Sequence, residues 1–155
     1  MTADGVSVRV AEPRDSDRMR DVSTAARGVE GADQSGAIAG ADALVLVAER
    51  DGAVVGWAKT HHFESAFGPA PAGHYLGGVN VHPEFQRLGI GSALTSARLD
   101  WIRERASETW FFTNVRNSAS IALHARLGFV EVARAREFQG VSFEGGAGIL
   151  FRLAL

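Results

Sequence analysis

The fold is decided by the stretch Val79-Asn-Val-His-Pro-Glu-Phe-Gln-Arg-Leu-Gly-Ile-Gly-Ser-Ala-Leu94. Val79 and Val81 end an apolar strand, and the proline that follows cannot donate a further ladder hydrogen bond. Gly89 and Gly91 permit close backbone approach immediately before apolar residues with helical spacing. The stretch therefore predicts a strand, a tight turn and a helix that starts near Gly91.

The start of that helix is suited to binding an anion. The first turn of a helix leaves backbone N–H groups unpaired and carries the positive end of the macrodipole, so phosphate is a natural ligand there. Arg87 adds a positive charge. The stretch is not a Walker A loop, because no Lys-Ser/Thr pair follows the glycines, and it lacks the Gly-x-Gly-x-x-Gly spacing of dinucleotide sites. An ordinary strand, turn and helix containing two glycines is the alternative.

Size and composition narrow the class of protein. The chain has 155 residues, 46% of them hydrophobic and 22% charged, which predicts a single globular domain over residues 1–155. Sixteen basic residues against 18 acidic ones, with no basic block, argue against a nucleic-acid partner. The absence of cysteine excludes disulfides and thiolate chemistry. No signal-like or membrane-spanning run is evident, so we expect a cytoplasmic protein without a membrane partner.

Hydrophobic periodicity and turn signals predict the element order β-α-β-β-β-α-β-α-β-β. An Asp-Gly pair predicts a hairpin between the second and third strands. The strands are expected at Val6–Val10, Leu44–Glu49, Ala53–Phe63, His74–Val81, Thr109–Asn114, Phe129–Ala133 and Ala147–Leu155, and the helices at residues 15–26, 91–106 and 118–127. Residues 139–146 are expected to form a turn.

Two other features have more than one interpretation. Residues 28–43 are rich in Gly, Ala and acidic side chains, which predicts a loop or a short helix that either connects elements or lines a substrate site. Gly77 and Gly78 lie inside an expected strand. They indicate a bulge or the close approach of another backbone or a ligand.

A second motif, Asn117 followed by Ile-Ala-Leu-x-x-x-Leu-Gly-Phe129, completes a family resemblance. Together with Gln86-Arg87-x-Gly89-x-Gly91 it resembles the GNAT acyltransferase superfamily. The resemblance covers most of the chain, although before residue 44 it is only topological. It implies an α+β fold with a mixed sheet whose two central parallel strands, ending at Val81 and Asn114, splay apart. It also implies acetyl-CoA as co-substrate, with its pantetheine arm between those strands, and no metal.

The resemblance also implies roles for individual residues. The oxyanion donor would be a backbone N–H on the strand that ends at Val81. His124 occupies the position where family members usually place a tyrosine as the acid for the leaving thiolate. An imidazolium can serve as that acid, or His124 is a neighbour of the cofactor and water supplies the proton. The expected cofactor contacts are Val79, Val81, Gln86, Arg87, Leu88, Gly89, Ile90, Gly91, Ser92 and Asn117.

The general base cannot be chosen from spacing alone, because a bulge would change the face that each strand residue occupies. Adjacent histidines in a strand point to opposite faces, so His61 and His62 do not indicate a metal site. Tyr75 is the base candidate that we name. The full set of base candidates is His61, His62, Glu64, His74 and Tyr75.

The expected reaction is transfer of the acetyl group of acetyl-CoA to a primary amine of a small molecule or protein, by direct attack in a ternary complex. The alternatives are a regulatory module that binds CoA with little turnover, another acyl-CoA donor, or an oxygen acceptor. A homodimer is one alternative for the oligomeric state. The acidic loop residues mildly favour a cationic acceptor; they are Glu30, Asp33, Asp42 and Glu64.

Overall fold

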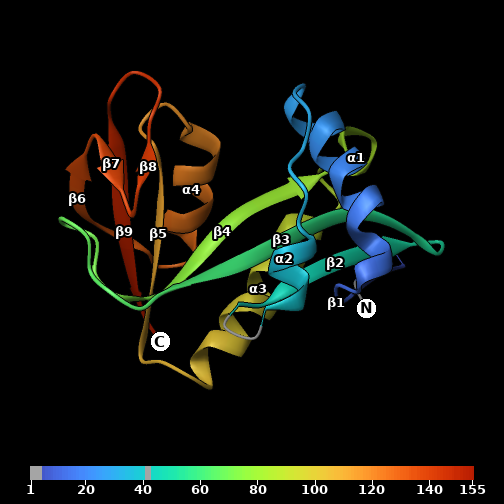
Figure 1. Cartoon of the computed structure of the whole chain (residues 1–155), viewed down its shortest axis with the longest axis horizontal. Helices are drawn as coiled ribbons and strands as arrows, with labels where there is room; N and C mark the ends of the chain where they lie inside the picture. The colour runs from blue at the N-terminus through green and yellow to red at the C-terminus, as the bar shows by residue number, and fades with distance from the viewer. Residues whose placement is uncertain (1–4, 41–42) are drawn as a thin grey trace. The chain divides into compact units, whose positions relative to one another are not determined.

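The structure is a computed structural model that describes residues 5–40 and 43–155 (Figure 1). Its strands are β1 (Val6–Val10), β2 (Val45–Arg50), β3 (Ala53–Phe63), β4 (Gly73–Val81), β5 (Glu108–Asn114), β6 (Val130–Ala135), β7 (Glu137–Phe138), β8 (Val141–Ser142) and β9 (Gly148–Ala154). Its helices are α1 (Ser16–Arg27), α2 (Ser35–Ala39), α3 (Ile90–Arg103) and α4 (Ser118–Arg126), with short 3-10 turns η1 (Pro13–Asp15) and η2 (Pro83–Phe85).

Seven strands form one mixed sheet in the order β1-β2-β3-β4-β5-β9-β6. The pairs β1–β2, β2–β3, β5–β9 and β6–β9 are antiparallel, whereas β4 and β5 run parallel with Tyr75 opposite Trp110. This confirms the expected α+β fold with a partly parallel sheet. The splaying of β4 and β5 stays a prediction.

The predicted elements are present, with two additions. Residues 28–43 contain the short helix α2, one of the two expected forms of this segment. Residues 139–146 contain turns at 139–140 and 144–146, as expected, but they also contain the short strand β8, which pairs with β7 as a small antiparallel hairpin. Two-residue strands are too short to show a periodic pattern, which is why the sequence did not reveal them.

The described residues group into two compact units. The first unit consists of the chain up to His61 together with Gly77–Trp101, and the second consists of His62–Leu76 together with Ile102–Leu155. The assignment of residues 1–155 to one domain stays a prediction. Each unit is therefore described by itself.

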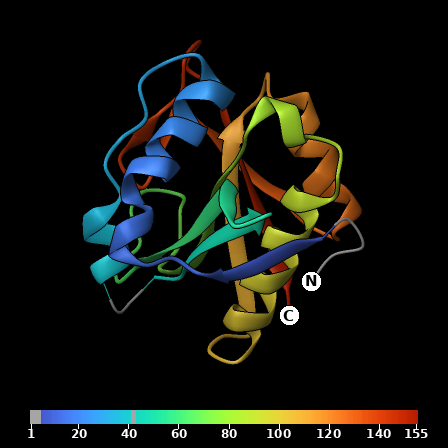
Figure 2. The same ribbon diagram turned by 90° about the vertical axis from the view of Figure 1, so that its right-hand side faces the viewer.

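In the first unit, β2 and β3 carry apolar side chains on both faces. Leu46 of β2 belongs to a buried cluster with Ile90 and Leu94 of α3, whereas Val47 belongs to a cluster with Met19 of α1. Successive strand residues point to opposite faces, so one strand packs against both helices. Figure 2 shows α1 and α3 on opposite sides of these strands. The packing fixes α3, and therefore the loop that precedes it.

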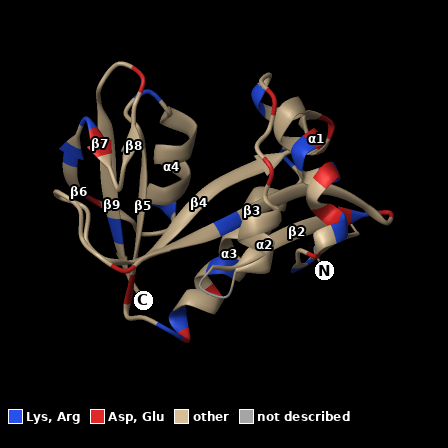
Figure 3. Cartoon of the chain, in the orientation of Figure 1, with Lys and Arg blue, Asp and Glu red and all other residues tan. Residues whose placement is uncertain are grey.

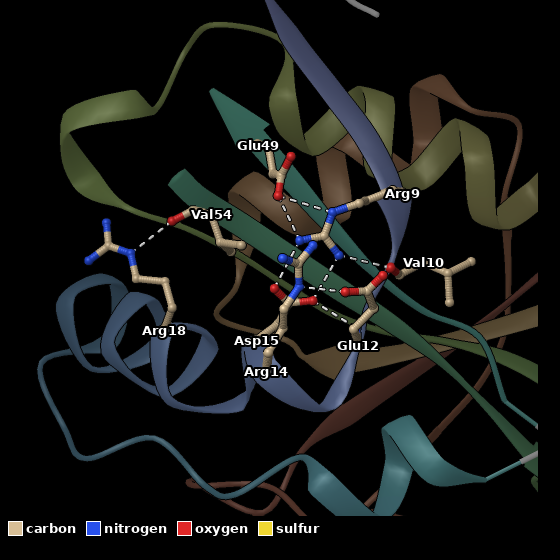
Figure 4. A network of polar contacts seen from close by, with 8 residues as sticks. All are labelled: Arg9, Val10, Glu12, Arg14, Asp15, Arg18, Glu49 and Val54. Carbon is tan, nitrogen blue, oxygen red and sulfur yellow. Dashed lines mark hydrogen bonds and ion pairs between the residues drawn. The ribbon is translucent and has the colours of Figure 1, made fainter. Parts of the chain in front are cut away.

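An ion-pair network ties β1 and β2 to the start of α1 (Figure 4). Arg9 donates two hydrogen bonds to the Asp15 carboxylate, at 2.8 and 2.9 Å, and two to Oε1 of Glu49. The backbone N–H of Glu12 also donates to Asp15, at 2.7 Å. The hydrogen bonds from Arg9 lower the pKa of Asp15, so this buried side chain is a carboxylate at neutral pH.

In the second unit, β5 alternates between two aromatic environments. Trp110 and Phe112 join a cluster with Tyr75, Phe138 and Leu150. Phe111, between them, points to the other face, where it stacks on a side chain of α4. These aromatic contacts hold β5 between α4 and the β7–β8 hairpin in the core of the unit.

Candidate functional site

The loop before α3 has the backbone conformation expected of an anion site. Arg87 (φ 65°) and Gly89 (φ 79°) adopt left-handed conformations, which an arginine rarely does. The Ala93 N–H donates to the Gly89 carbonyl at 3.0 Å, which places the helix start at Ile90, one residue before the predicted position. The N–H groups of Ile90 to Ser92 therefore have no acceptor within the helix. No acidic residue lies in this first turn to occupy them.

The packing of the first unit does not explain a glycine at position 91. A Cβ on Gly91 would meet only Cγ1 of Val79, at 3.8 Å, which is an ordinary contact. A Cβ on Gly89 would meet nothing within 4 Å, although its positive φ favours glycine. The helix start thus has open space beside it, as a ligand held by backbone N–H groups requires.

The other predicted cofactor residues of the first unit divide into exposed and packed side chains. Gln86, Arg87 and Ser92 are exposed, and Gln86 Nε2 donates to the Val81 carbonyl at 3.3 Å. Ile90 is fully buried. The partly buried Leu88, Val79 and Val81 pack against the same core cluster as Ile90, so contacts from these four residues would come from their backbones.

Gly77 marks a close approach between β4 and β3, as predicted. A Cβ on Gly77 would lie 2.8 Å from the Lys59 carbonyl oxygen and 3.1 Å from His61 Nε2. It would therefore point toward the face of β3 that carries the side chains of Lys59 and His61, whereas Val79 packs into the opposite cluster with α3. Gly77 and Val79 are two residues apart and would share a face in a regular strand. Because they point to opposite faces, the alternation of side chains along β4 is interrupted at Gly78.

Arg98 is the residue of this region that sequence reasoning missed. It is fully buried on α3, and its Nη1 atom donates to the carbonyl oxygens of Lys59 (2.9 Å) and Gly77 (2.8 Å). Burial lowers its pKa to about 10, so the guanidinium is still charged at neutral pH. The spacing of Arg98 in the sequence could have indicated its burial, because it follows Ile90 and Leu94 at four-residue intervals on the apolar stripe of the helix.

Asn117, the predicted cofactor residue of the second unit, is the N-cap of α4. Its Oδ1 accepts from the Ser120 N–H at 3.2 Å, and its Nδ2 donates to Thr113 Oγ1 at 3.3 Å. The motif asparagine therefore has a clear structural role at the start of the helix. Its contact with a cofactor stays a prediction.

His124 lies in the aromatic core of the second unit rather than on its surface. Its ring stacks on Phe111 with centroids 3.6 Å apart, and 3% of the residue is exposed. Nδ1 is 2.7 Å from the Ser120 carbonyl oxygen, which can only accept, so the ring carries its proton on Nδ1. Proton exchange by His124 would therefore use Nε2. Its role as an acid stays a prediction.

Tyr75 has the contacts of a core residue. Its hydroxyl donates to the Pro71 carbonyl at 2.6 Å, and its ring packs between Phe63, Trp110 and Phe112. Burial raises its pKa to about 12. A phenol with that pKa is a poor proton acceptor at neutral pH, so these contacts disfavour the predicted base role.

The remaining base candidates differ in their environments. His61 is half-buried, and its pKa is lowered to about 4 by burial and by the charges of Lys59 and Arg98. His62 is exposed and lies 4.5 Å from His74, ring to ring. The pKa of His74 is lowered mainly by burial. Glu64 is exposed.

Within residues 5–40 and 43–155, no cluster of three or more His, Asp or Glu side chains could hold a metal ion. None of the helices in these ranges has both the length and the apolar character needed to cross a bilayer.

Comparison with known proteins gives the family. Residues 15–129 match the Acetyltransferase (GNAT) family model. The chain is 34% identical over 109 residues to aminoglycoside N(6')-acetyltransferase type 1 of Klebsiella aerogenes, covering 68% of this chain and 70% of that protein. It is 37% identical over 94 residues to mycothiol acetyltransferase of Cellulomonas flavigena, covering 57% of this chain but only 27% of that protein.

A solved structure shows the same fold. The yncA protein of Salmonella typhimurium, determined with its cofactor acetyl-CoA, superposes with a TM-score of 0.72 and 24% identity, over 97% of this chain and 94% of that chain. The fold, the glycine loop before α3 and a family match over most of the sequence agree. The chain belongs to the acetyltransferase (GNAT) family of acyltransferases.

Proposed function

We propose that the protein transfers the acetyl group of acetyl-CoA to a primary amine. The observation that carries this proposal is the start of α3, where N–H groups without intrahelical acceptors, the left-handed Arg87 and a glycine at position 91 that packing does not require occur together. In the family to which the chain belongs, this loop corresponds to the cofactor pyrophosphate site. Backbone N–H groups from Arg87 to Ser92 would hold the pyrophosphate, with the Arg87 guanidinium as a charged donor.

The β4 backbone would supply the remaining polar contacts between the first unit and acetyl-CoA. Backbone groups at Val79 and Val81 are the proposed partners of the pantetheine amides, because the side chains of both residues pack into the core. An N–H group freed by the interruption at Gly78 is the proposed donor to the thioester oxygen. Asn117 is the proposed contact from the second unit.

The chemistry requires little from side chains. The amine nitrogen forms a bond to the acetyl carbon, the carbon–sulfur bond breaks, the nitrogen loses a proton and the thiolate gains one. His124 is the proposed acid for the thiolate. The base stays open among His61, His62, Glu64 and His74, because the raised pKa and the engaged hydroxyl of Tyr75 disfavour it.

The acceptor is proposed to be an amine of a small molecule. Curated relatives are named for mycothiol and for aminoglycosides, and another is named N-alpha-acetyltransferase. The chain spans about a quarter of the length of the mycothiol acetyltransferase and 70% of the aminoglycoside enzyme. The similarity therefore supports acetyl transfer without selecting either acceptor, and a protein amine is the alternative. A cytoplasmic location stays a prediction.

Two measurements test the proposal. Calorimetry should detect binding of CoA and acetyl-CoA, and the melting temperature should rise, since a ligand at a hundredfold excess over its dissociation constant stabilises the folded state by about 2.7 kcal/mol. Release of free thiol from acetyl-CoA with a panel of amines then measures transfer. Binding without thiol release for any amine would favour a CoA-binding regulatory module, and no binding at millimolar CoA would contradict the proposal.

A further inference from the structure

A cationic group faces the α1 and α2 side of β3. Lys59 lies two residues after Trp57, which packs against α1, and opposite Val45 of the same cluster, so its side chain emerges on that face. Its Nζ atom donates to Gln34 Oε1 at 2.9 Å. His61 follows on the same face. We call Lys59, Gln34 and His61 the Lys59 cluster.

Lys59 is unusual within this sequence. It is the only lysine among the 16 lysine and arginine residues. Lys59 is the only basic residue of β3, a strand that contains no acidic residue, and Figure 3 shows this strand in tan with a blue segment. Most basic side chains of soluble proteins are solvated, whereas Lys59 is partly buried and burial lowers its pKa. The chain thus places its one lysine ammonium group where hydration is restricted.

Among residues 5–40 and 43–155, no acidic side chain pairs with this charge. The bond to Gln34 uses one of the three ammonium donors, and its acceptor is a neutral amide. A second cation lies behind the strand, because Arg98 binds the Lys59 carbonyl oxygen. Partly buried charges are costly unless they are paired. An anion placed beside Lys59 would offset this cost.

His61 lies in the same positively charged environment as Lys59. Burial is the largest cause of its lowered pKa, followed by the charges of Lys59 and Arg98. The ring is therefore neutral at neutral pH, and it can donate one hydrogen bond without adding a charge. His61 Nε2 and Lys59 Cγ each lie 3.1 Å from the position that a Gly77 Cβ would occupy. The cluster thus borders the part of β4 that precedes the proposed oxyanion donor.

The acidic loop residues that the structure describes, Glu30, Asp33 and Glu64, do not pair with the cluster. Asp33, next to Gln34, accepts from the Ser35 N–H and hydroxyl and lies 4.0 Å from Arg20. Glu30 and Glu64 are exposed. Asp42 lies outside the described residues. The expectation of a cationic acceptor, which rested on these four residues, is therefore not supported by the charge on this face of β3.

From these contacts we infer that the acceptor carries a carboxylate as well as its primary amine, and that Lys59, assisted by the Gln34 side-chain amide, binds the carboxylate. The inference rests on the proposed acetyl transfer and specifies its acceptor as an amino acid or a similar compound. An ammonium and an amide N–H₂ suit a carboxylate, which accepts several hydrogen bonds at once. Positive charge beside the amine also favours its unprotonated, nucleophilic form.

The test compares amines in matched pairs. The common amino acids and their β- and γ-amino homologues are each assayed as the carboxylate and as the carboxamide. Rates are expressed per unprotonated amine, because the ammonium group of a carboxamide has a lower pKa than that of the matching carboxylate. The wild type should prefer at least one carboxylate by roughly ten- to a hundredfold in kcat/KM, as expected for a charge-assisted hydrogen bond. Lys59→Met should abolish the preference through KM, and Lys59→Arg should retain part of it.

A second measurement does not depend on turnover. Because the chain has one lysine, acetic anhydride modifies a single lysine side chain, and mass spectrometry follows its rate against a lysine-containing reference peptide. With CoA present, the carboxylates should slow modification of Lys59 at least severalfold, whereas their carboxamides should not. Lys59→Met should leave CoA affinity unchanged.

The outcomes separate this inference from the proposed function. The carboxylate site would be overturned if the enzyme acetylates the carboxamides as well as or better than the carboxylates. It would also be overturned if Lys59→Met keeps the preference for carboxylates. Both outcomes would leave the proposed acetyl transfer intact. Absence of CoA binding would contradict the proposed function itself. If no amine is acetylated and no carboxylate protects Lys59, the inference is also overturned.

Discussion

The Arg98 guanidinium lies 2.8 Å from the carbonyl oxygen of Gly77, and both residues are buried. The same nitrogen donates to the Lys59 carbonyl, so one side chain of α3 satisfies oxygen atoms of two strands where β4 departs from regular alternation. Without this side chain, two buried carbonyl groups would lack these donors.

Arg98→Met should therefore destabilise the fold, by roughly 1–3 kcal/mol for each carbonyl left without a donor. Arg98→Lys should lose less, because an ammonium can reach one of the two oxygen atoms. Urea denaturation measures both variants. The control is Arg126→Met, which changes an exposed side chain of α4 and should alter stability by about 0.5 kcal/mol or less. Equal losses in Arg98→Met and Arg126→Met would contradict the structural role of Arg98.

Local chemistry explains which parts of the fold could be predicted. Asp51 and Gly52 have φ values of 52° and 80°, as a tight hairpin requires, and Gly28 ends α1 with φ 73°. The glycine loop was predictable for the same reason, because the residue types suited to positive φ and to helix starts are few. Asn117, a residue type that favours helix N-caps, caps α4.

Long-range packing explains what could not be predicted. The burial of Arg98 depends on carbonyl groups 39 and 21 residues away in the chain, which no local pattern indicates. The interruption at Gly78 decides which side chains of β4 share a face, so the face of Tyr75 relative to Val79 could not be assigned from spacing. Tyr75 looked available as a base because its bond to Pro71 forms only in the folded loop.

Gly91→Glu should separate folding from cofactor binding. A carboxylate near a helix start interacts favourably with the macrodipole, and a Cβ at position 91 would make only an ordinary contact with Val79, so stability should be unchanged or slightly higher. The same charge would repel a pyrophosphate and block its approach. We expect CoA affinity to fall by roughly a hundredfold or more, which corresponds to about 2.7 kcal/mol.

The matched control for this variant is Ser96→Glu, which adds the same charge at an exposed position of the same helix. Calorimetry should show near wild-type CoA affinity for it. If Gly91→Glu also binds CoA normally, the phosphates lie elsewhere.

Arg87 combines a strained backbone with the charge proposed to bind phosphate. Arg87→Gly should leave stability unchanged or raise it by up to about 1 kcal/mol, because glycine adopts positive φ without strain but is more flexible when unfolded. CoA affinity should nevertheless fall by roughly tenfold, through loss of a charge-assisted hydrogen bond.

Asp51→Gly is the control for Arg87→Gly, since Asp51 also has a positive φ but lies in the β2–β3 turn. It should show a similar small change in stability and unchanged CoA affinity. A wild-type CoA affinity for Arg87→Gly would remove Arg87 from the proposed site.

Asp15 makes the stability of the first unit sensitive to acid. Hydrogen bonds from Arg9 lower its pKa in the folded state, so its contribution is present above the unfolded-state pKa of about 3.9 and is lost as the pH falls through the folded pKa. Asp15→Asn should cost about 1–3 kcal/mol at neutral pH and should weaken the loss of stability on acidification. Urea denaturation at several pH values measures both effects.

An exposed ion pair provides the contrast to Asp15. Glu131 pairs with Arg134 at 2.9 Å on the surface of β6. Glu131→Gln should leave stability unchanged at neutral pH, because exposed pairs are screened by solvent. A loss as large as that of Asp15→Asn would show that burial is not what distinguishes the two sites.

His124 is the position where the chain departs from the tyrosine of the family pattern. If imidazolium Nε2 gives its proton to the thiolate, His124→Phe should lower kcat by roughly ten- to a thousandfold with little change in CoA affinity. The stacked contact with Phe111 makes phenylalanine a suitable replacement, because a flat apolar ring can occupy the same place. The stability of the variant should therefore remain close to that of the wild type.

His124→Tyr should restore much of the activity lost in His124→Phe. The acid must be protonated to act, so activity falls as pH rises through its pKa. The pKa of a phenol is ordinarily higher than that of an imidazole, so tyrosine should move this alkaline limb upward. The measurement is kcat against pH for the three proteins, with product release measured separately because it can mask the chemical step. Equal rates with the same pH dependence would show that water protonates the thiolate and that His124 only supports Phe111 in the core.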